Sequence, residues 1–202
     1  AYTVPISVYI SFINTGIWTY SAVFYVFLLI PLLDFLFGET EENLSNNDAA
    51  YQNKKWIFDI MLYFNVPIIF GLLYVIFSLF QVNNYNTFET IGLALSTGIL
   101  LATNGINVAH ELGHRKPYFE RLLSKLLYMP CLYMHFYIEH NFGHHLHVAT
   151  SEDGATAKYN QSVYSFWITS VTKQYFDAWK NQKKLLKNKN SSFLSLKNDM
   201  LW

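Results

Sequence analysis

The residues best suited to chemistry in this chain are its histidines. All seven fall between residues 110 and 147 of the 202. They form two clusters, His110-Glu111-Leu112-Gly113-His114 and Glu139-His140-Asn141-Phe142-Gly143-His144-His145. Because residues four apart share one face of an α-helix, each cluster can offer two imidazoles to one site. His145 is turned about 100° from His144 on a helix, so it can reach a second metal ion.

The two clusters together favour iron over zinc. HELGH alone is also the zinc-peptidase motif, with Glu111 as general base, and this alternative stays open beside a plain solvated histidine pair. A zinc peptidase needs one further ligand, whereas the second cluster offers three histidines. Redox-active iron can use O₂ and electrons to break an unactivated C–H bond, which zinc cannot do. The ligand candidates are His110, His114, His140, His144 and His145.

The polar neighbours of these histidines have more than one interpretation. Glu111 and Glu139 could bind metal, or could accept a hydrogen bond from the second ring nitrogen of a ligand histidine. His135 stands alone on an apolar stretch, which favours a buried hydrogen-bonding residue over a ligand. His147 is either a surface residue or a support for a ligand. The residues expected to support the ligands without being assigned as ligands are Asn107, Glu111, His135 and Glu139.

The composition places these histidines in a membrane protein. Charged residues make up 14% of the chain and hydrophobic residues 52%, whereas an ordinary soluble domain is about 25% charged. Such hydrophobicity excludes a disordered chain. The formal net charge of zero provides no basic field for nucleic acid. A single cysteine, Cys131, excludes a disulfide framework and a cysteine-ligated metal site.

Three stretches are long and apolar enough to cross a bilayer, at 16–37, 56–80 and 91–109. A spanning helix needs about 20 mainly apolar residues, and small residues in the third stretch suit close helix packing. The shorter stretch 1–13 is expected to be part of a further span. A soluble helical bundle is the alternative, but few charges are available to cover these runs. Tyr118–Tyr137 is expected to form an amphipathic or half-inserted helix that returns the second cluster to the first.

The lysines and arginines indicate the orientation of these spans. Twelve of the fourteen follow His110, the other two are Lys54 and Lys55, and the loop 81–87 has none. The positive-inside rule therefore places residues 38–56 and everything after His110 on the cytoplasmic side.

The residues around the histidines resemble those of the membrane-bound non-haem di-iron alkane 1-monooxygenases, or alkane hydroxylases. HELGH alone is shared by several protein classes, whereas its combination with EHNFGHH and VATSED is specific. Fatty-acid desaturases and xylene-type monooxygenases share histidine boxes but fit the flanking residues less well. The resemblance covers nearly the whole chain. Its motifs are Asn107–Lys116, His135-Phe136, Glu139–His145, Val148–Asp153, Pro31–Asp34 with Phe37–Glu39, and Ser195–Leu201.

The resemblance implies an all-α, integral membrane bundle of six spans in the bacterial cytoplasmic (inner) membrane. It also implies two non-haem iron ions, O₂ as co-substrate, and terminal hydroxylation of medium- or long-chain n-alkanes to 1-alkanols. Electrons would come from rubredoxin, with rubredoxin reductase upstream. The other partners would be the n-alkane and membrane lipid, with no nucleic acid. By the same resemblance the iron ligands would be His110, His114, His140, His144 and His145.

The resemblance further implies that the enzyme extends beyond this chain. The family has a third box, H-x-x-H-H, one more histidine upstream of that box, and two further spans, none of which this sequence contains. We therefore expect one incomplete membrane hydroxylase domain over 1–202, with a histidine region at 110–150 and a cytoplasmic segment at 151–202. The remaining ligands are expected beyond Trp202, and the fragment alone is expected to be inactive.

The basic residues after His110 have two interpretations. They could steer an acidic redox protein toward the site. They also fit simple positive-inside topology and attraction to anionic lipid headgroups. The residues concerned are Arg115, Lys116, Arg121, Lys125 and the lysines between Lys173 and Lys197.

Overall fold

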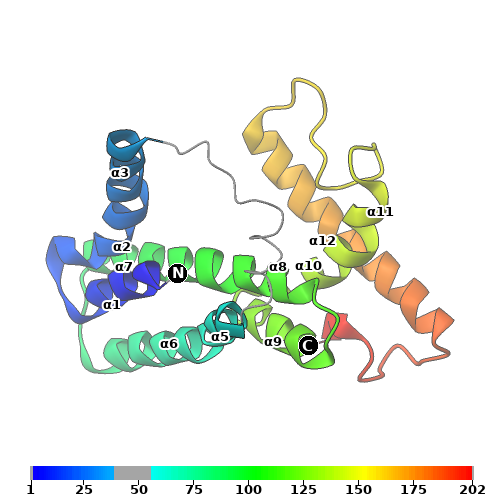
Figure 1. The fold of residues 1–202 in the computed structure, drawn as a ribbon, viewed down its shortest axis with the longest axis horizontal. Helices are drawn as coiled ribbons and strands as arrows, with labels where there is room; N and C mark the ends of the chain where they lie inside the picture. The colour runs from blue at the N-terminus through cyan, green and yellow to red at the C-terminus, as the bar shows by residue number, and fades with distance from the viewer. Residues whose placement is uncertain (1, 39–55, 202) are drawn as a thin grey trace. The chain divides into compact units, whose positions relative to one another are not determined.

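A computed structural model describes residues 2–38 and 56–201, and these residues form helices and connecting turns without a β-strand (Figure 1). The expected all-α class is confirmed. The chain divides into two compact units, Ala1–Ala109 and His110–Trp202. Residues 39–55, which include the two lysines at 54 and 55 on which the orientation partly depends, lie outside the described residues.

The first unit is built mainly from apolar helices. Its α-helices are α1 (Thr3–Ile13), α2 (Ser21–Phe24), α3 (Ile30–Phe37), α5 (Trp56–Tyr63), α6 (Asn65–Val82) and α7 (Thr87–Leu100). A 3₁₀ turn, η1 (Gly16–Tyr20), and two π-helical turns, η2 (Tyr25–Leu29) and η3 (Leu101–Ile106), continue them. Helix α8 (Asn107–Gly113) follows η3 directly and carries the first histidine cluster.

The three expected spans correspond to helical stretches long and apolar enough to cross a membrane. In the described part of the chain these are Gly16–Phe37, Trp56–Val82 and Thr87–Gly113. The third begins earlier than the expected residue 91 because Asn86 and Glu89 form a capping box. Asn86 Oδ1 accepts from Glu89 N at 2.9 Å, and Glu89 Oε2 accepts from Asn86 N at 3.1 Å. The same stretch also continues through the first histidine cluster.

The second stretch is interrupted at Phe64, between α5 and α6. Pro67 has no N–H to donate to the carbonyl four residues earlier, so the regular hydrogen-bond series is broken there. The side chain of Asn65 supplies local donors instead. Its Nδ2 lies 2.8 Å from Met61 O and 3.2 Å from Leu62 O. The polar side chain thus helps to satisfy carbonyls beside the interruption, as an apolar surrounding requires.

Buried polar pairs join the helices of the first unit. Ser96 Oγ lies 2.9 Å from Thr19 O and 3.1 Å from Ser11 Oγ, so α7 is connected to η1 and α1. Asn104 Nδ2 donates to Asn65 Oδ1 at 2.8 Å, which connects η3 to α6. Hydrogen bonds of this kind hold apolar helices in one register.

The second unit carries both histidine clusters. Its elements after α8 are α9 (Tyr118–Tyr128), α10 (Met134–Glu139), the π-helical turn η4 (His140–His144), α11 (His145–His147), α12 (Val163–Asn188) and the 3₁₀ turn η5 (Asp199–Leu201). The single helix expected over 118–137 is wrong, because the chain turns between α9 and α10. Pro130 cannot donate a backbone hydrogen bond there, and Leu132 adopts a left-handed φ of 53°.

Helix α12 is the support of the second unit. It packs against α10, η4 and η5, and it begins at Ser162, whose side chain accepts a hydrogen bond from Ser165 N. Its buried residues recur at every fourth position, which defines one face: Ser170, Gln174, Ala178, Gln182 and Leu186. Near the end of the chain, Gln182 Nε2 donates to Lys197 O at 3.0 Å, and Lys125 pairs with Asp199. These contacts connect α9, α12 and η5.

We predict that Gly92→Ala destabilises the first unit. A Cβ at Gly92 would lie 2.3 Å from Thr19 Oγ1 and 2.6 Å from Tyr20 Cε2, and overpacking of this kind costs about 1–3 kcal/mol. Gly98→Ala on the same helix is the matched control, because no heavy atom lies within 4 Å of its added Cβ. Thermal unfolding of the full-length protein in detergent should give a lower midpoint for G92A alone. Equal midpoints for the two variants would contradict the close approach of η1 and α7.

Candidate metal centre

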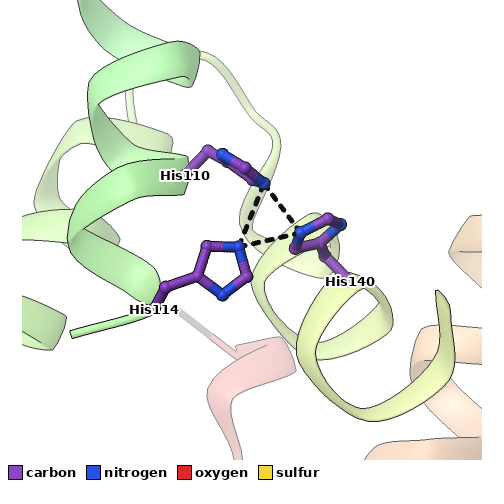
Figure 2. A group of neighbouring side chains, drawn as sticks. All are labelled: His110, His114 and His140. Atoms are coloured by element: carbon purple, nitrogen blue, oxygen red, sulfur yellow. Dashed lines mark hydrogen bonds between the residues drawn. The ribbon is translucent and has the colours of Figure 1, made fainter. Parts of the chain in front are cut away.

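The second unit brings the two histidine clusters together. The Nε2 atoms of His110, His114 and His140 lie 2.7 to 3.1 Å from one another (Figure 2). His145 adds a fourth Nε2, 3.1 Å from that of His140. Four of the five histidines expected to bind metal therefore meet around His140.

Helix α8 provides the first pair of rings. His110 lies on this helix and His114 follows its last residue, with the two ring centroids 4.6 Å apart and the ring planes at 90°. Gly113 lies where the helix approaches its neighbours closely. A Cβ there would be 3.1 Å from Ser124 Oγ on α9 and 3.5 Å from Tyr137 Cδ2 on α10. The small residue in HELGH thus allows the pair to lie near the second cluster.

The π-helical turn η4 provides the second group of rings. Gly143 faces α12 closely, since a Cβ there would lie 2.8 Å from Asn181 Nδ2. The ring of Phe136, one turn earlier, stacks on His140 with centroids 4.9 Å apart and planes at 16°. Stacking on Phe136 therefore limits the directions that the His140 ring can adopt, and the close approach at Gly143 places the turn against α12.

The geometry of this turn differs from the α-helical spacing expected for it. In a π-helical turn the backbone hydrogen bond joins residues five apart, so the turn is wider than an α-helical turn. His145, five residues after His140, consequently has its Nε2 beside that of His140. His144 lies parallel to His140 with centroids 5.3 Å apart, and its Nδ1 is 3.0 Å from Asp153 Oδ2. The parallel rings of His140 and His144 agree with the expectation that these two residues share a face. The expectation that His145 points to another side is corrected, because its Nε2 lies 3.1 Å from that of His140.

The chemistry of this group suits a metal ion. Two nitrogens bound at right angles to one ion, about 2.1 Å from it, lie about 3.0 Å apart, and the Nε2 spacings of 2.7 to 3.1 Å are close to this value. Burial, reinforced by the neighbouring imidazoles, lowers the pKa of His140 to about 3. Burial also lowers the pKa of His114. Both rings are thus neutral at pH 7, which is the form that binds metal.

Two of the expected supporting residues lie apart from the converging nitrogens. Glu111 is half exposed, and its Oε1 accepts from Arg115 Nε at 3.0 Å and lies 2.9 Å from Arg115 Nη2. Asn107 lies at the start of α8 with an exposed side chain. His147 is also outside the group, since its Nδ1 lies 3.3 Å from Oε2 of the exposed Glu152.

Of the other two supporting candidates, Glu139 is buried and His135 is partly buried. Glu139 is 2% exposed, and its Oε2 has no hydrogen-bond partner within the described part of the chain. Burial raises the pKa of Glu139 to about 7, and the charge of Asp153 adds to this effect. The ring of His135 lies 4.6 Å from that of Tyr133 and 5.4 Å from that of Tyr175. His135 is thus packed against aromatic rings, and its buried Nε2 has no hydrogen-bond partner within the described part of the chain, so the expected hydrogen bond is not seen there.

Asp153 is a buried residue whose contact with the site was not anticipated from the sequence. Its side chain is fully buried against His144, and it accepts hydrogen bonds from Ala155 N and Thr156 Oγ1. Burial alone would raise the pKa of Asp153, but these hydrogen bonds and that of His144 hold it below its usual value. An aspartate followed by glycine, with a threonine three residues on, is typical of a turn in which the side chain binds the backbone. That signal predicts the turn but not its contact with His144.

Comparisons with known proteins agree with this site. Residues 86–202 match the family model described as fatty acid desaturase. The chain is 34% identical to an alkane 1-monooxygenase of Ectopseudomonas oleovorans, over 92% of this chain and 49% of that protein. It is 30% identical to alkane 1-monooxygenase 2 of Alcanivorax borkumensis, over 98% of this chain and 53% of that protein. The chain is 28% identical to a xylene/toluene monooxygenase hydroxylase component of Pseudomonas putida, over 77% of this chain and 43% of that protein.

These matches confirm the resemblance drawn from the motifs. The chain spans about half the length of the curated relatives it matches. The matched region of the family model begins at the cap of α7 and includes both histidine clusters. Three apolar helical stretches accompany this match. The chain is therefore an integral membrane protein that belongs to the fatty acid desaturase family.

Proposed function

We propose that the protein hydroxylates the terminal carbon of medium- or long-chain n-alkanes to 1-alkanols in an O₂-dependent reaction. The observation that carries this proposal is the convergence of neutral imidazole nitrogens from His110, His114 and His140 in a chain similar to alkane 1-monooxygenases. The balanced reaction consumes an alkane, O₂, two electrons and two protons, and it yields a 1-alkanol and water.

The proposed cofactor is a pair of non-haem iron ions. Imidazole is a suitable ligand for iron, and the bound metal would supply the reductive activation of O₂. His110, His114, His140 and His145 would bind through Nε2. His144 is the fifth proposed ligand, with its Nδ1 occupied by Asp153 and its Nε2 left for metal. Phe136 would hold the His140 ring in plane and keep water from its face.

The apolar helices would bring the substrate to this site. His110 and His114 come at the end of the helical stretch Thr87–Gly113, which is apolar enough to cross a membrane. An n-alkane partitions into the hydrocarbon core of a bilayer. It could therefore approach the site along the spans without first crossing water. This supports an alkane or another lipid-soluble substrate over a polar one.

The proposed electron donor is rubredoxin, reduced by rubredoxin reductase, on the cytoplasmic side of the bacterial inner membrane. A basic cavity in the second unit supports an acidic redox partner. It has a volume of about 560 Å³ and includes His114 in its wall. The same charges also fit positive-inside topology and contact with anionic lipid. The basic residues in its wall are Arg115, Lys116, Arg121, Lys125, Lys189 and Lys197.

A fatty-acid desaturase or a xylene-type monooxygenase is the second candidate function. The family match and the similarity to a xylene/toluene monooxygenase component favour this class. Both would use the same metal chemistry on a different substrate. Product analysis of the full-length protein with octane, hexadecane, xylene and acyl lipids separates them. We expect 1-octanol or 1-hexadecanol, and formation of only an unsaturated acyl chain or a benzylic alcohol would overturn the alkane proposal.

We predict that His140→Gln removes metal and activity, because the Nε2 of His140 lies within 3.1 Å of three other histidine Nε2 atoms. Full-length wild-type protein should contain about two iron ions per chain. Removal of a hydrogen-bond partner of a metal ligand lowers metal affinity by roughly 10- to 100-fold. Removal of His140, a proposed ligand itself, should lower it by at least as much. Iron analysis and 1-octanol formation measure both effects.

The control for this substitution is His147→Gln, since the side chain of His147 pairs with the exposed Glu152. H147Q should keep the iron content and the rate of the wild type. Equal iron content in H140Q and wild type would contradict the proposed site. Stoichiometric zinc in the wild type would contradict iron as the bound metal.

We predict that Glu111→Gln retains alkane hydroxylation, because the Glu111 carboxylate pairs with Arg115. His145→Gln should abolish hydroxylation. A zinc peptidase built on HELGH predicts the reverse, with Glu111 essential as general base and His145 dispensable. Rates of octane hydroxylation and of peptide cleavage, measured on both variants, distinguish the two mechanisms. Peptidase activity lost in E111Q and kept in H145Q would establish the zinc alternative.

A further inference from the structure

The buried carboxylate of Asp153 contacts the site from outside the histidine clusters. Its side chain is 0% exposed, and that of His144 is 23% exposed. The separation between His144 Nδ1 and Asp153 Oδ2 is 3.0 Å, which is hydrogen-bond distance. A charge-assisted hydrogen bond shielded from water in this way is stronger than one between neutral groups.

The turn around Asp153 fixes the position of the carboxylate. Ala155 N donates to Asp153 Oδ1 at 2.9 Å, and Thr156 Oγ1 donates to Oδ2 at 2.5 Å. The backbone N of Asp153 in turn donates to Thr150 O at 3.3 Å. Both carboxylate oxygens therefore have donors from the turn itself. The turn alone therefore fixes the direction in which the Asp153 carboxylate faces His144.

Helix α12 holds this turn in place. Lys173 Nζ donates to Ser151 O at 3.0 Å and to Glu152 O at 2.6 Å. Gly154 lies against the same helix, since a Cβ there would be 3.2 Å from Gln174 Cγ and 3.3 Å from Gln174 N. Because α12 also packs against η4, one helix supports both the histidine turn and the carboxylate that meets it.

This arrangement decides which nitrogen of His144 is available to metal. A neutral imidazole carries one proton, and a carboxylate acceptor at Nδ1 requires that proton to be on Nδ1. The lone pair of Nε2 is then free. His110, His114, His140 and His145 also present Nε2 to the converging group, so the hydrogen bond makes His144 chemically equivalent to them.

We propose that Asp153 is the positioning residue for His144. It holds the ring, which lies parallel to that of His140 with centroids 5.3 Å apart, as the Nδ1–H tautomer with Nε2 directed to the metal centre. This inference rests on the proposed metal-binding role of the histidines. It adds a carboxylate outside the histidine boxes to the residues on which metal retention depends.

The test measures the release of Fe(II) from full-length protein to a colorimetric chelator. Wild type is compared with Asp153→Asn, which keeps the shape and one acceptor, and Asp153→Ala, which keeps neither. Removal of an outer hydrogen-bond partner costs about 10- to 100-fold in metal affinity. We expect release of one iron to accelerate about 10-fold or more in D153A and less in D153N. Glu152→Gln, at the exposed neighbouring carboxylate, should release iron as the wild type does.

A double-mutant cycle separates positioning from a general loss of structure. If Asp153 acts through His144, then D153A accelerates release in the wild-type background but adds nothing in a His144→Gln background. Mössbauer spectra of ⁵⁷Fe-loaded D153N should show a changed signal for one iron and an unchanged signal for the other. Equal acceleration by D153A in both backgrounds, or identical spectra of D153N and wild type, would overturn the proposal.

Failure of the Asp153 proposal can be distinguished from failure of the proposed function. Wild-type product analysis tests alkane hydroxylation, whereas the cycle tests metal release whichever substrate the enzyme uses. If the wild type retains zinc, the proposed function fails, and the same cycle with zinc and a zinc chelator still tests Asp153.

If D153A unfolds, Thr156→Val provides the second variant, since it removes one donor to the carboxylate and leaves Asp153 itself intact. T156V should accelerate release a few-fold only when His144 is present, and acceleration without His144 would count against the proposal.

Discussion

The helix packing that brings the His140 ring to the rings of α8 is the constraint on which the histidine site of the second unit depends. Neutral imidazole nitrogens placed 2.7 to 3.1 Å apart gain little from one another unless a cation or proton lies between them. The scaffold must therefore supply the energy that holds them. It does so by close backbone approach at Gly113 and Gly143, and by the packing of α10 and η4 on α12. The histidine site is in this sense a consequence of helix packing rather than its cause.

The first unit satisfies a different constraint, because its helices are apolar and their polar groups need partners within the protein. Ser96 meets Thr19 and Ser11, and Asn104 meets Asn65. Glu89 completes a capping box and also accepts from Gly16 N at 2.7 Å. In hydrocarbon an unsatisfied polar group costs several kcal/mol. These pairs accordingly restrict the register in which α1, α6 and α7 can pack.

The spans and the gathering of the histidines could be predicted from the sequence because both follow from local chain properties. Apolar runs predicted the three helical stretches, and the ligand spacing of HELGH agrees with an α-helix in α8. Small residues in the third stretch predicted close packing, but they did not distinguish Gly92, which faces Thr19, from Gly98, which faces open space. That difference depends on which side of the helix meets a neighbour. The turn between α9 and α10 was missed because apolar periodicity continues across it, although Pro130 marks the break. The contact of Asp153 with His144 depends on how a turn packs against α12, and no local pattern contains that information.

The π-helical turn also has a consequence for inheritance. A π-helical turn is closed by a hydrogen bond between residues five apart, which is one residue more than in an α-helical turn. Because His145 stands five residues after His140, loss of one residue between His140 and His144 would leave histidines three and four residues after His140. An imidazole would thus remain at the position where an α-helical turn places it on the face of His140. Gene comparisons across this family can therefore treat the length of this turn as a heritable character in its own right.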